Sequence, residues 1–202
     1  MNRQPGLWTF FLAAIAWFLV TTLVWVQVSA WTSYPAAALT HIVLGNGAKD
    51  WVRTMHKTPG QLQVNTRIKV PVADKAPGRG KAELVVETDP AHYAYGLPLF
   101  LALLLASRSP HMVGRAVAGY LILLVPQTFS LAFDILKQIM VAGNPASLGI
   151  APWRMETIAL GYQFGSLLLP TLAPIALWLW LDRAFFSAVI VEGYLRRTTT
   201  AD

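Results

Sequence analysis

Residues 7–28 form one uninterrupted apolar stretch, and this stretch constrains what the whole chain can fold into. The segment LWTFFLAAIAWFLVTTLVWVQV contains no charged residue over 22 positions. As an α-helix it is about 33 Å long, which matches the hydrocarbon thickness of a bilayer. It is longer than the apolar core of a typical secretory signal, although the small residues after Gln27 leave cleavage there as an alternative. We therefore predict a membrane-spanning first helix.

The composition of the chain agrees with a membrane protein and narrows its chemistry. Of the 202 residues, 55% are hydrophobic and only 13% are charged, which leaves room for several crossings but for no large soluble catalytic domain. The sixteen Lys and Arg residues form no basic run, so lipid headgroups explain them better than nucleic acid. The absence of cysteine excludes disulfides, cysteine-ligated metals and a cysteine nucleophile.

The predicted fold is a mainly α-helical integral membrane protein with four transmembrane helices. Residues 1–45 hold the first span and an interfacial helix that stops at Gly45. Residues 91–181 hold the other three spans, and residues 182–202 form an interfacial or cytoplasmic tail. These three spans are expected at residues 93–106, 112 to about 133, and about 158 to 181. Prolines inside the last two indicate bent helices that pack together.

Residues 46–90 differ from the rest and form the one sizeable extramembrane segment. They hold eight of the sixteen basic residues and five of the ten acids. Apolar and polar residues alternate from Leu62 to Val70 and again from Ala82 to Glu87, which predicts two strands joined by the loop PVADKAPGRG. An isolated β-hairpin is marginally stable, so we expect one face of it to rest on helices, headgroups or a partner chain.

The basic residues also predict an orientation across the membrane. Taken alone, the eight Lys and Arg of the connector place it in the cytoplasm. The span ends argue for the reverse arrangement, because one side is consistently basic and the other carries acids. The basic side has Arg3, Arg108, Arg115, Arg183, Arg196 and Arg197, and the acidic side has Asp89, Asp134 and Glu156. We expect both termini in the cytoplasm and the hairpin in the periplasm.

Two predicted spans carry a polar stripe, and ionisable residues near a span are candidates for function. Helical spacing places Gln127, Ser130, Asp134 and Gln138 on one face of the third span, with Lys137 beside them. The fourth span carries Glu156, Gln163 and Ser166 on one face. Because the two helices are antiparallel neighbours, equal spacing predicts that Asp134 and Lys137 meet Glu156, and that Gln127 meets Gln163.

Three interpretations of this cluster stay open from the residues alone. It joins the helices through hydrogen bonds of about 1 kcal/mol each. It relays protons as an acid–base pair, because two close acids push their pKa values apart. Or it docks another membrane protein.

Aromatic residues at the predicted span ends indicate where the membrane surface lies. His92, Tyr93, Tyr95 and Trp153 are interface candidates of the kind found in aromatic belts. The four histidines, His41, His56, His92 and His111, show no paired spacing typical of metal ligands. We expect no metal, no cofactor and no catalytic residue, because the chain also has no P-loop, GxSxG or HExxH motif.

Several segments together resemble a known family, the exosortase H-associated membrane proteins of bacteria. Besides the first span and the strand-rich connector, the resemblance lies in YAYGLPLFLALLLA at residues 93–106, FDILKQ at 133–138 and GYQFGSLLLPTLAPIALWLWLDR at 161–183. The resemblance implies an accessory role beside an exosortase, a transpeptidase that processes proteins bearing a C-terminal sorting helix. Exosortases resemble cysteine enzymes, so a chain without cysteine does not fit the enzyme itself.

The favoured hypothesis is a non-catalytic membrane subunit that acts as a scaffold or presents substrates in envelope protein sorting. Its expected partners are the bilayer and an exosortase-like transpeptidase or the substrate helix. A membrane hydrolase or transferase using Asp134, Glu156 and His92 is the first alternative. A small oligomeric transporter is the second.

Overall fold

The computed structural model describes residues 7–71, 81–108, 110–145, 148–183 and 187. They divide into two compact units. The sheet unit comprises Val28–Ala94 and Leu124–Pro170, and the helical unit comprises Met1–Gln27, Tyr95–Leu123 and Thr171–Asp202. Helices α1 (Leu7–Thr32) and α4 (Met112–Ala142) contribute residues to both units.

Within the described residues, three helical stretches are long and apolar enough to cross a membrane, where the sequence predicted four. These stretches are Trp8–Gly47, Met112–Ala142 and Pro152–Leu181. The predicted second span is the short helix α3 (Gly96–Ala106), preceded by the 3₁₀ turn η1 (Pro90–Tyr93). Its 11 residues rise about 16 Å, roughly half of the hydrocarbon thickness. The prediction of a fourth crossing is therefore not confirmed.

The first long stretch consists of α1 and helix α2 (Tyr34–Gly47), which meet at Ser33. Pro35 has no backbone N–H to donate back into α1, so the helix is interrupted there. The Ser33 hydroxyl and the Ser33 backbone N–H both donate to the Ser29 carbonyl, at 2.7 and 3.0 Å. The segment predicted to lie at the interface thus continues the first helix as far as Gly47.

The connector folds into a three-stranded antiparallel sheet in the order β1-β2-β3, rather than the predicted two-stranded hairpin. The strands are β1 (Val52–Thr58), β2 (Gln61–Pro71) and β3 (Lys81–Thr88). Strands β2 and β3 pair as expected, with Val64 opposite Val86. Residues 72–80, which make up most of the predicted loop, lie outside the described residues, as does most of the predicted tail beyond Arg183.

One face of the sheet supplies the core of the sheet unit. Leu62 and Val64 are fully buried on β2, and they pack with residues of α2 and α4. The core consists of Ala37, Leu44, Val52, Met55, Leu62, Val64, Val86, Leu131, Ala132, Ile135 and Ile139. The other face is polar, with an Arg53–Glu83 ion pair across the strands. The sheet is therefore amphipathic, and the chain's own helices cover its apolar face.

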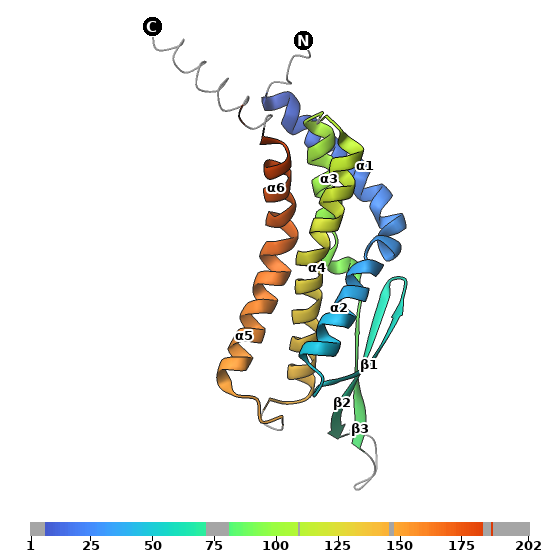
Figure 1. Cartoon of the computed structure of the whole chain (residues 1–202), viewed down its shortest axis with the longest axis vertical. Coiled ribbons are helices and arrows are strands. Elements are labelled where there is room, and N and C mark those ends of the chain that lie inside the picture. Colours follow the sequence, from blue (N-terminus) through green and yellow to red (C-terminus); the bar gives the residue numbers. More distant parts are fainter. Residues whose placement is uncertain (1–6, 72–80, 109, 146–147, 184–186, 188–202) are drawn as a thin grey trace. The chain divides into compact units, whose positions relative to one another are not determined.

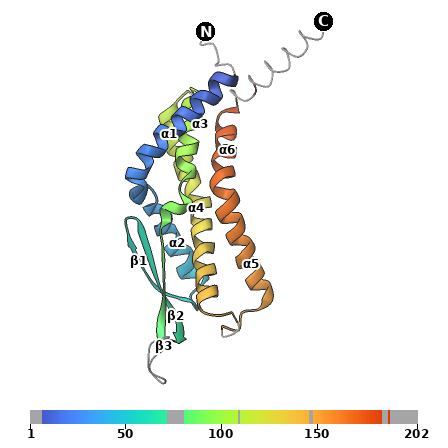
Figure 2. The same cartoon turned by 180° about the vertical axis from the view of Figure 1, so that it is seen from behind.

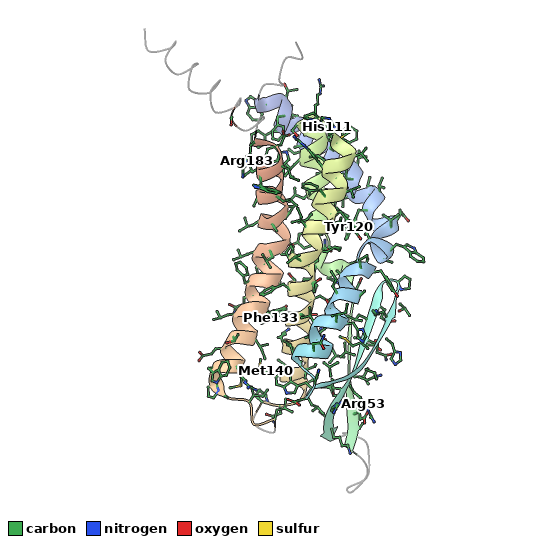
Figure 3. The ribbon with its side chains drawn as sticks, viewed as in Figure 1. Arg53, His111, Tyr120, Phe133, Met140 and Arg183 are labelled. Atoms are coloured by element: carbon green, nitrogen blue, oxygen red, sulfur yellow. The ribbon has the colours of Figure 1, made fainter. Side chains whose placement is uncertain are left out.

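Figures 1 and 2 show how the sheet unit is arranged around the second half of α4. The strands and α2 lie on one side of α4, and helix α5 (Pro152–Gln163) lies on the other. A π-helical turn, η2 (Phe164–Leu168), joins α5 to α6 (Leu169–Leu181). Figure 3 places Arg53 on the sheet and Phe133 on α4.

The helical unit has its own apolar core, built from α1, α3, α4 and α6. Phe100 and Leu104 of α3 are fully buried, and Phe10 of α1 stacks on Trp178 of α6 at 5.5 Å between ring centroids. Gly119 of α4 lies directly against the Phe100 ring, so a side chain at this position would displace it. α3 is thus a packed core helix.

The sheet core gives a testable stability difference between two valines. Val64 is fully buried, whereas Val85 on β3 is 44% exposed. We expect Val64→Ala to lower the free energy of unfolding by about 2 kcal/mol, because buried methyl groups and their contacts are lost. We expect Val85→Ala to change it by less than about 0.5 kcal/mol. Thermal unfolding in detergent measures both, and equal effects would contradict the described packing.

Candidate functional site

The carboxylate of Asp134 is the centre of the polar cluster in the sheet unit. The α4 helix places Asp134 toward the end of the sheet, where only 6% of the residue is exposed. Its Oδ2 accepts hydrogen bonds from the Thr88 hydroxyl at 3.0 Å and from the Gln138 amide at 2.8 Å. Thr88 is the last residue of β3, and Gln138 is one turn further along α4. The cluster therefore links the sheet to the helix.

Tyr93 lies against the same carboxylate from the η1 turn. Burial raises the pKa of the Tyr93 phenol, and the negative charge of Asp134 and a side-chain hydrogen bond to it raise this pKa further. The phenol thus lies next to the Asp134 carboxylate. Thr88 of β3 and Gln138 of α4 donate to this buried acid, and Tyr93 of η1 lies beside it.

The chain between β3 and η1 is fixed locally, which holds Thr88 and Tyr93 in place. Asp89 caps the turn, because its Oδ1 accepts from the Ala91 backbone N–H at 2.9 Å. Pro90 stands at the first position of the turn, where its missing N–H costs no hydrogen bond. The DPAHY segment is therefore a short cap whose geometry follows from its sequence.

The packing between α4 and α5 brings a second group of residues together on the other side of α4. The Ser130 hydroxyl donates to the Gly165 carbonyl at 2.6 Å, and the Phe133 ring lies against Gly161. The ammonium of Lys137 lies 4.4 Å from the centroid of the Tyr162 ring, within the range of a cation–π contact. Two glycines let the helices approach closely at this point.

This register differs from the predicted one. Asp134 was expected to meet Glu156, and Gln127 to meet Gln163. Both Glu156 and Gln163 are instead exposed. Because Ser130 contacts Gly165, α5 and η2 are displaced along α4 by more than one helical turn from the alignment that equal spacing predicts. Of the predicted cluster, the structure brings together Asp134 and Gln138, with Lys137 turned to Tyr162 instead.

Gln127 is buried next to Thr128, after Pro126 on α4. Among the described residues, no hydrogen-bond partner is found for Gln127 Oε1 or Thr128 Oγ1.

The predicted interface residues lie apart from this cluster, with the exception of Tyr93. His92 is exposed, and its Nδ1 is 3.8 Å from Asp89. Tyr95 and Trp153 are 38% and 62% exposed, respectively. His92 and Glu156 are thus exposed, whereas Asp134 is buried. No group of three or more metal-binding side chains occurs in the part of the chain that the structure describes.

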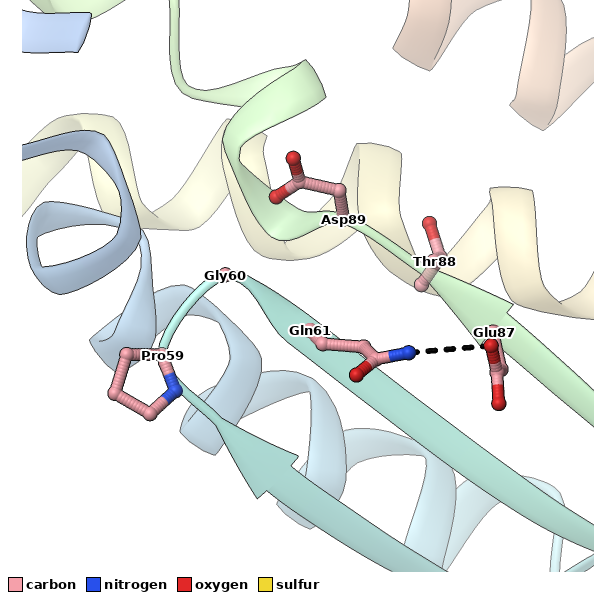
Figure 4. Close-up of a pocket in the computed structure, with 6 residues that line it drawn as sticks. All are labelled: Pro59, Gly60, Gln61, Glu87, Thr88 and Asp89. Atoms are coloured by element: carbon pink, nitrogen blue, oxygen red, sulfur yellow. Dashed lines mark hydrogen bonds between the residues drawn. The ribbon is translucent and has the colours of Figure 1, made fainter.

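An open hollow lies beside the Asp134 cluster, at the turn between β1 and β2. Figure 4 shows its lining, which includes Gln61, Glu87 and Thr88. The Gln61 amide donates to Glu87 at 3.1 Å across the strands. The hollow has a volume of about 480 Å³ and is lined by Pro59, Gly60, Gln61, Glu87, Thr88 and Asp89. Its polar side chains bond mainly to each other or to the turn.

The helical unit contains a buried ion pair that the sequence analysis did not identify as a pair. Arg115 Nη1 of α4 lies 3.1 Å from Oδ1 of Asp182, whose side chain is 3% exposed. Nearby in the same unit, the indole N–H of Trp178 donates to the Ser107 hydroxyl at 3.3 Å. In the sequence, the signal for this pair is the presence of opposite charges at the ends of two apolar segments. This pair connects α4 to the end of α6, whereas the Asp134 cluster connects the sheet to α4.

A family model matches residues 4–185, which is nearly the whole chain, and its description is exosortase H-associated membrane protein. The chain belongs to this family. No curated protein and no solved structure matches it. Family membership agrees with the resemblance found in the sequence, and with a membrane protein that has three long apolar helices.

The saturated environment of Asp134 leads to a prediction for its amide variant. Asp134→Asn keeps the shape of the side chain but removes its charge, and it leaves one amide oxygen to accept from both Thr88 and Gln138. We expect a loss of about 1–3 kcal/mol in unfolding free energy, because both hydrogen bonds lose a charged acceptor and a buried N–H group replaces the second carboxylate oxygen. Thermal unfolding and membrane abundance measure this loss.

The matched control is Glu156→Gln, which makes the same chemical change at an exposed position. We expect it to alter stability by less than about 0.5 kcal/mol. An Asp134→Asn protein with unchanged stability would show that the carboxylate is no structural anchor.

Proposed function

We propose that this exosortase H-associated protein is a non-catalytic accessory subunit that holds exosortase H in the bacterial inner membrane or presents substrates to it. The observation that carries the proposal is the use of the polar residues. Asp134 is buried and bonded within the chain, whereas His92 and Glu156 are exposed and apart from it. A general acid or base must reach its substrate, and Asp134 is covered.

The first long helix supports a role in binding another membrane protein. Of the most apolar 18-residue segment in the stretch Trp8–Gly47, only 6% is buried by the rest of the chain. Large side chains such as Trp8, Leu19 and Leu23 are 60% or more exposed. Such a surface is available to lipid and to the helices of a partner, and the family description provides the partner's class.

The sheet supports contact with the part of the partner outside the bilayer. Its polar face carries Arg53, Glu83 and Glu87, while its apolar face is covered by α2 and α4. We propose that this polar face lies in the periplasm and that both termini are cytoplasmic, as the basic span ends predict. The sheet then stands on the side where a sorted protein would emerge.

The two alternatives have weaker support. An enzyme using Asp134, Glu156 and His92 would need a rearrangement that uncovers Asp134 and brings the other two residues to it. A transporter would need an oligomer, because few helices cannot enclose a path.

Purification in mild detergent tests the proposal directly. With exosortase H co-expressed, affinity capture of this chain is expected to recover exosortase H in a constant ratio. A photo-cross-linking residue at exposed Leu23 should attach to the enzyme, whereas the same residue at Ala14, which packs on the helical core, should not. Recovery of the chain alone, with cross-links to lipid only, would contradict a subunit role.

A further inference from the structure

An apolar groove lies in the sheet unit between α2, α4 and α5, away from the Asp134 cluster. It has a volume of about 470 Å³, which is within the usual range of roughly 300–1,000 Å³ for small-molecule sites. The groove is lined by Val43, Leu44, Gly47, Ala48, Asp50, Trp51, Ala132, Phe133, Leu136, Trp153, Arg154, Thr157 and Ile158. Nothing in the fold or the proposed function above assigns an occupant to it.

The floor of the groove suits a hydrocarbon chain. Ala132, Phe133 and Leu136 come from one face of α4, and Leu44 and Ile158 close the sides. Leu44, Ala132 and Ile158 are buried, so this surface belongs to a packed, pre-formed site. A floor of aliphatic and aromatic groups binds a ligand by removing apolar surface from water. It does not select the ligand through directional hydrogen bonds.

The lining of the groove carries both signs of charge. Asp50, Trp153 and Arg154 are exposed there, and Trp51 is half-buried. The guanidinium of Arg154 lies 5.3 Å from the Trp153 ring, so the cation rests at the groove edge. Asp50 therefore offers a carboxylate to a cation, and Arg154 offers a guanidinium to an anion.

The groove lies where two of the long apolar stretches end along the chain. Gly47 is the last residue of the stretch Trp8–Gly47, and Pro152 is the first residue of the stretch Pro152–Leu181. Gly47 lines the groove, as does Trp153, which follows Pro152. Tryptophans near the ends of apolar helices are typical of contact with lipid headgroups.

We propose that this groove is a binding site for one zwitterionic phospholipid with a primary-amine headgroup. One acyl chain lies on the floor formed by α4, the phosphate binds Arg154, and the ammonium binds Asp50. The primary amine is selected because it donates hydrogen bonds to a carboxylate, which a quaternary ammonium lacks. An anionic glycerol headgroup has no cation for Asp50 and is repelled by it.

The chain offers a matched pair of glycines for the test. An added Cβ at Gly47 or at Gly45 meets no atom within 4 Å, so both positions accept a side chain without a clash. Gly47 lines the groove, whereas Gly45 does not. Gly47→Phe should fill the groove, and Gly45→Phe should add the same ring on the same helix outside it.

Native mass spectrometry of the purified full chain, with dioleoyl phosphatidylethanolamine, phosphatidylcholine or phosphatidylglycerol added, measures the binding. We expect one retained phosphatidylethanolamine per chain, bound about tenfold more tightly than the other two lipids. Gly47→Phe should lose the retained lipid, and Gly45→Phe should keep it. Asp50→Asn should remove the preference over phosphatidylcholine, and Arg154→Gln should weaken all three lipids by about fivefold or more.

Three results would overturn the proposal. One is equal retention of the three lipids by the unchanged chain. Another is equal retention by the two phenylalanine variants when both unfold at the same temperature as the unchanged chain. The third is a photo-cross-linker at Thr157 that attaches to a partner protein and to no lipid, since the groove would then be a protein interface. If Gly47→Phe fails to fold, the headgroup preference of Asp50→Asn decides the question alone.

Discussion

The hydrogen bonds to the Asp134 carboxylate are the constraint on which the sheet unit depends. A buried carboxylate is costly unless donors surround it, and here Thr88 of β3 and Gln138 of α4 donate to it while the Tyr93 phenol of η1 lies beside it. The apolar contacts of Leu62 and Val64 bury one face of the sheet against α2 and α4. Hydrogen bonds are directional, so the bond from Thr88 adds a fixed point between β3 and α4.

Much of the sheet and of the helix content could be predicted from local patterns, but β1 could not. Strand β2 alternates regularly, so Leu62, Val64 and Thr66 all point inward and reveal it. On β1 the buried residues Val52 and Met55 are three positions apart, which hides a two-residue period. A register shift between Val52 and Thr54 accommodates Arg53 as an extra residue and returns Met55 to the inner face. An irregular strand of this kind shows itself only once its partner is known.

The same distinction between local and non-local information applies to the span count and the site. The segment 93–106 is apolar, but its first residue, Tyr93, belongs to the η1 turn that Asp89 caps, and α3 begins only at Gly96. The segment is therefore not one continuous helix. Asp134 and Gln138 are one turn apart on one helix, so their meeting follows from spacing alone. Which residues of α5 face Asp134 does not follow from spacing. The close approach of the helices at Gly161 and Gly165 and the π-helical turn after Gln163 set the register of α5 against α4. Thr88 reaches Asp134 only through the fold of the sheet.

The chain belongs to the exosortase H-associated membrane protein family, and the part that the structure describes has three helical stretches long and apolar enough to cross a membrane. Within the sheet unit, the sheet packs on α2 and α4. The hydrogen bond from Thr88 to Asp134 is the polar joint between the sheet and α4.

A double-mutant cycle between Thr88 and Asp134 tests this joint most directly. Thr88→Val, Asp134→Ala and the double variant would be compared with the unchanged chain by unfolding in detergent. We expect the two substitutions to be coupled by about 1 kcal/mol or more, because the second change removes a bond that the first has already broken. Strictly additive effects would mean that the bond between sheet and helix contributes nothing, and would contradict the account.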